Sequence, residues 1–320
     1  MSTQPYDAGT LRLAAGAAIH APSLLNSQPW LLRLRDGGIE LLSDPARRLA
    51  VADRTGWATR IACGAATYNA RLALAANGTP ADVRLRPYPA QPEAVARLTP
   101  ALPRPPTYPE LDLFAAVPRR HSNRRPFWPD PVPADVRTRL IEAARDEGAW
   151  LDLLVGIAAL SGFAQIARSA DQTLRRDPAY QAEFAAWIHT EAAGDGVPVT
   201  AGGPAAEHQD LLPQRPFAGR RRAAGRDFEP EPLVGVLGST GDGPVDQINA
   251  GQALQRVLLT VTDAGLAGSM MSQPIEVPTA REQLRHSLHR SGIPQMALRI
   301  GYGSPGHPTP RRDVDDVIVR

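Results

Sequence analysis

The chain has 320 residues, a formal net charge of +2 and one cysteine, Cys63, so it can form neither an intramolecular disulfide nor a cysteine-rich metal site. It has no run of about 18 apolar residues and no secretory leader pattern, so we expect a cytoplasmic protein without a membrane span. The small net charge argues against a nucleic-acid partner, and we expect the arginine run at 219–226 to be a solvated loop.

The first hundred residues predict two helices and at least three strands. Residues 8–20 predict a helix that an Ala-Pro pair ends. Residues 30–44, WLLRLRDGGIELLSD, predict a hairpin around Asp-Gly-Gly. Apolar residues spaced by four and three predict a long helix over 56–77, and 81–88 predict a strand. Residues 87–109 contain eight prolines without periodicity, so we expect a linker there.

The rest of the chain predicts more helix, interrupted by one long irregular segment. We expect helices at 110–117, 133–148, 157–190, 245–266 and 279–290, and strands at 149–156, 232–240 and 295–303. Asp177-Pro178 predicts a break in the third of these helices. Residues 191–230 are rich in Gly, Pro and Arg, which is typical of a lid or of a disordered loop.

Two of the long helices resemble each other. GAATYNARLALAANG (64–78) and GQALQRVLLTVTDAG (251–265) share Gly, Ala, Leu and Gly at offsets 0, 2, 8 and 14. Chance agreement between common residues is one explanation, and a decayed duplication is the one we favour. Duplication would divide the chain into halves, 1–105 and 106–320, the second with a lid-like insertion at 191–230, that pack as a pseudo-dimer in one polypeptide.

Four short motifs resemble those of a known family. PSLLNSQPW (22–30) resembles a loop of the FMN-dependent nitroreductases, and RHSNR (120–124) resembles their arginine-serine motif. QPIE (273–276) resembles the family's segment beside the flavin ring, and PRR (310–312) resembles its C-terminal basic pair. The whole chain is similar to the Acg-like branch of this superfamily. The resemblance implies an α+β fold with an antiparallel sheet flanked by helices, in two tandem halves that form an internal pseudo-dimer.

The resemblance also implies an FMN site in which the flavin carries the chemistry, with no metal and no dedicated catalytic side chain. Arg120, Arg311 and Arg312 would neutralise the phosphate, and Arg124 would lie near flavin N1 and O2. Glu276 would act through its backbone N–H, directed at flavin N5. The residues implied to bind the cofactor are Pro22, Ser23, Leu24, Asn26, Arg120, His121, Ser122, Arg124, Pro274, Ile275, Glu276, Arg311 and Arg312.

The motifs are divided between the halves. The loop lies in the first half and the other three motifs lie in the second, where ARDEGAW stands in place of a second loop. One complete FMN site can therefore be assembled within one chain, and we expect a monomer.

Two functions fit these motifs. The first is an oxidoreductase that passes hydride from NADH or NADPH through FMN to a small molecule, such as a nitro compound, a quinone or another conjugated acceptor. The alternative is a flavin-binding or storage protein in which residues 191–230 close the site. The segment GYGSPG (301–306) matches the letters of the dinucleotide-binding pattern G-x-G-x-x-G. That pattern requires a helix directly after it, and the HPTPRRD that follows cannot begin one, so we do not expect a dinucleotide-binding site there.

Overall fold

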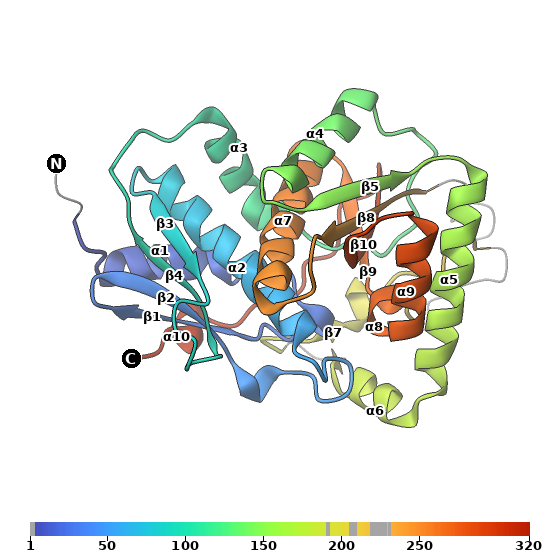
Figure 1. The fold of residues 1–320 in the computed structure, drawn as a ribbon, viewed down its shortest axis with the longest axis horizontal. Helices are drawn as coiled ribbons and strands as arrows, with labels where there is room; N and C mark the ends of the chain where they lie inside the picture. Colours follow the sequence, from blue (N-terminus) through green and yellow to red (C-terminus); the bar gives the residue numbers. More distant parts are fainter. Residues whose placement is uncertain (1–3, 190–192, 205–209, 218–228, 230–231) are drawn as a thin grey trace.

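The computed structural model describes residues 4–189, 193–204, 210–217, 229 and 232–320. Two long helices, α2 (Trp57–Ala76) and α7 (Pro244–Asp263), pack against each other at the centre of the molecule. A four-stranded antiparallel sheet lies on either side of this pair (Figure 1). Helices thus flank antiparallel sheets, and the architecture is α+β, as the family resemblance implies.

The first sheet has the strand order β1-β2-β4-β3. Its half consists of α1 (Ala8–Ala18), β1 (Trp30–Arg35), β2 (Gly38–Ser43), α2, β3 (Ala81–Leu85) and β4 (Ala94–Pro100). Asp7 caps α1, because its side chain accepts a hydrogen bond from the Thr10 N–H. The hairpin turn has positive φ at Asp36 and Gly37, as the Asp-Gly sequence predicts.

Strand β4 corrects the linker that we expected at 87–109. The prolines of this stretch flank the strand or close its end, so residues 94–99 are free to pair with β2 and β3. Proline removes a ladder donor only at its own position, and a stretch rich in proline can therefore contain a strand. The expected boundary at residues 105–106 falls between β4 and the next helix and stays a prediction.

The second sheet has the order β5-β8-β10-β9. The elements after β4 are α3 (Tyr108–Ala116), α4 (Ala134–Arg145), β5 (Trp150–Leu154), α5 (Ile157–Arg176), α6 (Pro178–Ala186), β6 (Ile188–His189), β7 (Val197–Pro198), β8 (Leu233–Ser239), α7, β9 (Ala267–Met271), α8 (Gln273–Glu276), α9 (Pro278–Ser287), β10 (Ile293–Gly301) and α10 (Val314–Val317). The break at Asp177-Pro178 is confirmed.

The two halves repeat one topology. Each has a helix, two strands, a long helix and two more strands, and each sheet has its strands in the same antiparallel order. They differ in two connections. The first two strands are joined by a tight turn between β1 and β2 but by a long insertion with α5 and α6 between β5 and β8, and the last two strands are joined by a loop between β3 and β4 but by α8 and α9 between β9 and β10. The repeated order supports the internal pseudo-dimer that we expected.

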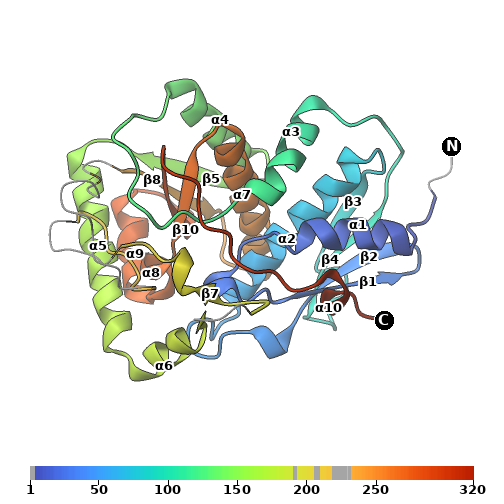
Figure 2. The same cartoon turned by 180° about the vertical axis from the view of Figure 1, so that it is seen from behind.

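The halves also share their cores. Trp57 and Ile61 of α2 belong to the core of the second half, while Ile248 of α7 belongs to that of the first. The C-terminal segment crosses back to the first sheet, where the Val319 N–H donates to the Leu32 carbonyl at 2.8 Å and α10 lies beside β1 (Figure 2). Within the described part of the chain, every helix is too short or too polar to cross a bilayer.

Candidate functional site

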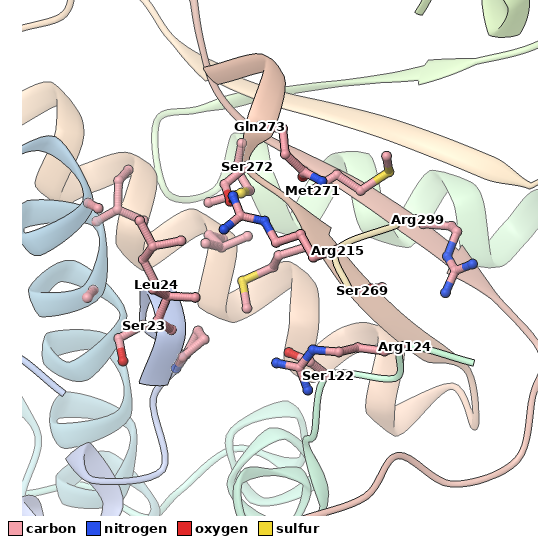
Figure 3. A pocket seen from close by; sticks show the side chains of 18 of the residues that line it. Ser23, Leu24, Ser122, Arg124, Arg215, Ser269, Met271, Ser272, Gln273 and Arg299 are labelled. Carbon is pink, nitrogen blue, oxygen red and sulfur yellow. The ribbon is translucent and has the colours of Figure 1, made fainter. Parts of the chain in front are cut away.

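A cavity opens where the two halves meet (Figure 3). Its empty space is about 990 Å³, including the part that is open to solvent. The first half supplies the loop after α1 and the first turns of α2, and the second half supplies the arginine-serine motif, β9, β10 and part of the insertion. The lining includes Pro22, Ser23, Leu24, Trp57, Ile61, Ser122, Arg124, Arg215, Met271, Gln273 and Arg299.

The loop from the first half has an unusual backbone. Leu25, Asn26 and Gln28 all have positive φ, at 52°, 57° and 50°. Residues other than glycine rarely adopt this left-handed backbone conformation. It is found where contacts with the surrounding structure hold the backbone in place. Here Ser23 Oγ accepts from the Gln28 N–H at 2.9 Å, and the side chains of Asn26, Ser27 and Gln28 are buried.

Asn26 ties this loop to the C-terminal basic pair. Its Nδ2 donates to the carbonyls of Gly196 and Pro310, both at 2.9 Å, and its Oδ1 accepts from Arg311 Nη1 at 3.1 Å. The structure thus brings together two motifs that lie 285 residues apart in sequence. The Asn26 side chain thus connects its own loop to Gly196, in the connection between β5 and β8, and to the C-terminal segment at Pro310 and Arg311.

Three arginines beside the cavity lie close enough to repel one another: Arg120 is buried, and Arg124 and Arg311 are half-buried. Burial lowers the pKa of Arg120 to about 9 and the pKa values of Arg124 and Arg311 to about 10. Repulsion by Arg311 contributes to the lowered pKa of both Arg120 and Arg124. The Nε atoms of Arg120 and Arg311 are buried without a hydrogen-bond partner, and no carboxylate among the described residues pairs with any of the three guanidinium groups.

Such a cluster is costly unless an anion joins it, because buried charge requires a counter-charge. Each of the three guanidinium groups donates to at least one backbone carbonyl. Arg120 Nη2 donates to the His20 carbonyl at 3.0 Å, and Arg124 Nη1 donates to the Ala201 carbonyl at 3.2 Å. Of the three, Arg124 lines the cavity and Arg120 and Arg311 do not. An anion that contacted this cluster would offset its charge.

His121 lies next to this cluster as a neutral imidazole. Burial, with repulsion from Arg120 and Arg311, lowers its pKa to about 4, and its Nδ1 is buried without a partner. The pKa of His20 is lowered for the same reasons. Both rings add polar atoms to the cluster without adding charge at neutral pH.

Arg312, which we expected at a phosphate, has a different set of contacts. Its backbone N–H donates to Gln28 Oε1 at 2.9 Å, and its guanidinium donates to the carbonyls of Gln28 and Trp30 at 3.3 Å each. Its side chain also lies 3.7 Å from an Asp44 carboxylate oxygen. Arg312 therefore binds the C-terminal segment to the first half. Of the two adjacent arginines, Arg311 is the one that lies in the cluster with Arg120 and Arg124.

The QPIE segment also differs from expectation. Pro274 and Ile275 are buried in the one-turn helix α8, and the Glu276 N–H donates to the Ser272 carbonyl at 2.9 Å. Because this N–H already donates a hydrogen bond within the helical turn, it is not available to donate to a ligand. The residues that line the cavity at this point are Ser272 and Gln273, at the start of the segment.

Two arginines in the cavity were missed by the sequence analysis. Arg299 pairs with Glu229 at 2.6 Å and donates to the Arg125 carbonyl at 2.8 Å, which fixes the backbone of the arginine-serine motif. A charged residue within the apolar strand QMALRIGYG was a signal for it. Arg215 lies in the irregular 191–230 segment, where no pattern separates it from the other arginines.

Part of that segment covers the cavity. Residues 212–215 and Phe217 line it, and Arg168 and Arg175 of α5 hold their backbone by donating to the Asp210 and Gln214 carbonyls at 2.6 and 3.1 Å. The arginine run at 219–226 lies outside the described residues.

The fold and the site define an α+β protein whose two similar halves line one cavity, with a cluster of arginines beside it. A Mycobacterium tuberculosis protein named "Putative NAD(P)H nitroreductase Rv3131" is 32% identical to the chain over 327 residues, which cover 99% of this chain and 93% of that protein. Another from that organism, "Putative NAD(P)H nitroreductase acg", is 28% identical and covers 96% of this chain and 95% of its own length. The chain belongs to this nitroreductase family, which confirms the resemblance seen in its motifs.

No protein-family model matches the chain. The solved structure of the FMN- and NADPH-dependent nitroreductase NfnB from a Sphingopyxis strain is 19% identical and has a TM-score of 0.43, over 65% of this chain and 98% of that one. A nitroreductase with bound FMN from Desulfitobacterium hafniense is 13% identical, with a TM-score of 0.42. The family assignment rests on the mycobacterial relatives.

Proposed function

We propose that the chain is an FMN-dependent oxidoreductase that uses NADH or NADPH to reduce a small conjugated acceptor. The observation that carries this proposal is the cluster of Arg120, Arg124 and Arg311, for which the described residues supply no counter-charge. A phosphate dianion at the end of a flat organic cofactor fits a cationic site that adjoins a largely apolar cavity. Membership of the nitroreductase family supports the same cofactor.

Different residues would bind different parts of FMN. Arg120 and Arg311 would hold the phosphate, with Ser122 and the neutral His121 as further partners. Arg124 would contact the cofactor farther along, since it lines the cavity itself, with its guanidinium 4.5 Å from the centre of the Phe217 ring. When bound, the flavin supplies a ring that accepts a hydride from a nicotinamide and gives it to a second molecule.

The apolar walls have a separate role. Leu24, Trp57, Ile61 and Met271 line the cavity and would exclude water from a ring bound between the halves. The backbone of the strained loop, which Asn26 holds in place, comes within reach of such a ring because Ser23 and Leu24 line the same wall. This chain's side chains thus bind, orient and shield, and the proposal requires no acid–base residue.

The purified protein provides the test. We expect a flavin spectrum, either as isolated or after reconstitution with FMN, that bleaches when NADH or NADPH is added without oxygen. Failure to bind FMN after reconstitution would rule out this function. Replacing Arg120 or Arg311 by Ala should release FMN during gel filtration, whereas replacing Arg119, which is exposed, should not.

A storage or carrier function is the second candidate. The observation that favours it is that residues 212–215 and Phe217 line the cavity, where they limit the space for a second molecule. It predicts tight FMN binding with bleaching by dithionite but not by either nicotinamide. The same anaerobic titration therefore separates the two functions.

A further inference from the structure

We propose that Arg215 determines acceptor specificity by donating a hydrogen bond from Nη1 to an oxygen of the acceptor bound in the cavity. The inference deepens the proposed oxidoreductase function and rests on it. It assigns a substrate contact to a residue of the long connection between β5 and β8, which in the first half corresponds to the tight turn between β1 and β2.

The two ends of the Arg215 guanidinium have unequal environments. Its Nη2 is bound by the Glu276 carboxylate and donates to Ser272 Oγ at 3.0 Å. Its Nη1 is buried without any hydrogen-bond partner, although the residue lines the cavity. Figure 3 shows the guanidinium beside Ser272, the acceptor of its Nη2 hydrogen bond. A buried donor without a partner is costly, and an oxygen of a bound molecule would satisfy it.

The guanidinium is held firmly in this position. The Glu276 side chain is only 1% exposed and also accepts from the Tyr180 hydroxyl at 2.8 Å. The Arg215 Cζ atom lies 5.9 Å and 5.8 Å from the ring centres of Tyr180 and Phe184. Binding an acceptor at Nη1 therefore requires little further ordering of the side chain, which favours affinity.

The charges around the cavity indicate which oxygen fits. Glu276 balances Arg215, and Glu229 balances Arg299, so two of the three lining arginines belong to ion pairs. The third, Arg124, has no carboxylate partner among the described residues and would lie farther along the cofactor than the phosphate. At Arg215 the pair is neutral overall, which suits the uncharged oxygen of a quinone or nitro group better than a carboxylate.

The test measures binding in the oxidised FMN-loaded protein, where no electrons are supplied and an acceptor remains unchanged. The probes are 1,4-naphthoquinone and 1,4-dimethylnaphthalene, which have similar shapes but differ in their oxygens. The readout is the perturbation of flavin absorbance on titration. We expect Arg215→Met to weaken quinone binding roughly tenfold and to leave dimethylnaphthalene binding unchanged, because only the quinone loses a charge-assisted hydrogen bond.

Two further variants separate this role from a structural one. Arg215→Lys keeps the ion pair with Glu276, but a single ammonium cannot reproduce the second arm of the guanidinium, so we expect it to lose the quinone preference as well. Arg175→Met loosens the same segment, since Arg175 Nη2 donates to the Gln214 carbonyl at 3.1 Å, without removing a donor from the cavity. It should keep the preference.

The outcomes distinguish this inference from the proposed function. Wild-type protein that binds no flavin would refute the function itself. Protein that retains flavin but shows equal quinone affinity in the wild type and Arg215→Met would refute the role of Arg215 alone. Full quinone preference in Arg215→Lys, or loss of flavin in place of quinone from Arg215→Met, would also overturn the inference, because Arg215 would then serve the fold or the cofactor.

Discussion

Gly64 of α2 and Gly251 of α7 face each other where the two central helices cross. A Cβ atom on Gly64 would lie 2.1 Å from the Ile248 carbonyl oxygen, and one on Gly251 would lie 2.1 Å from the Ile61 carbonyl oxygen. Each would also lie 3.0 Å from the Cα atom of the other glycine. In both directions the contact is to a residue three positions before the opposing glycine, which is the reciprocity that a two-fold axis produces.

This contact predicts that Gly64→Ala is strongly destabilising. A methyl group at 2.1 Å from a backbone oxygen must push the helices apart, and overpacking of this kind costs about 3 kcal/mol or more. The measurement is the free energy of unfolding in urea. Gly16→Ala is the matched control, because Gly16 lies in α1 with no atom within 4 Å of its Cβ position, and alanine there should stabilise by about 0.5–1 kcal/mol. Equal effects of the two substitutions would contradict the close crossing.

The arginine cluster predicts opposite effects on the protein with and without FMN. Arg120→Met removes a buried charge that has no carboxylate partner among the described residues, so thermal stability without FMN should not fall. FMN affinity should fall about 10- to 100-fold, because a charge-assisted hydrogen bond to phosphate is lost. Melting temperatures with and without FMN measure both effects. A large loss of stability in the FMN-free variant would show that Arg120 has a structural role.

Inorganic phosphate provides a separate measure of the same cluster. It should raise the melting temperature of the FMN-free protein more than chloride does at equal ionic strength, since a bound anion relieves the repulsion among the three arginines. Arg311→Met should reduce this difference, and replacement of the exposed Arg145 should not change it. Equal effects of phosphate and chloride on the wild type would argue against an anion site.

His121 predicts a loss of stability in mild acid. Its pKa is about 4 in the folded chain and 6.5 when unperturbed, so between these pH values the unfolded chain binds more protons. Stability therefore decreases as the pH falls from 6.5 toward 4, because protonation favours the unfolded state. His121→Asn should flatten this decrease in urea-unfolding experiments at pH 7 and 4.5, while substitution of the exposed His286 should leave the decrease in place.

The sequence predicts the elements and the motifs better than the contacts. Periodicity located α2 and α7, and the Gly64–Gly251 alignment indicated the repeat before any packing was known. Strand β4 was missed because prolines on either side obscured a short strand. Its pairing is decided by β2 and β3, which are contacts between distant residues that local pattern does not encode.

In the candidate site as well, motifs indicate some residues, while the role of others depends on contacts between distant parts of the chain. Motif resemblance located Arg120, Arg124 and Arg311, but it treated Arg311 and Arg312 as equivalent. Adjacent residues of an extended segment point in opposite directions, and only the packed tail determines which one reaches the cluster. Arg215 had no sequence signal at all, because its importance comes from Glu276, a partner 61 residues away.

The division of the motifs predicts a monomer with one FMN. Asn26 of the first half and Arg311 near the C-terminus contact each other within a single chain, so the site we propose needs no second copy. The central crossing of α2 and α7 already joins two halves of like topology within the one chain. Sedimentation should give a mass near 34.3 kDa, and absorbance should give one flavin per chain. A stable homodimer with two flavins at equivalent interfaces between chains would contradict the pseudo-dimer.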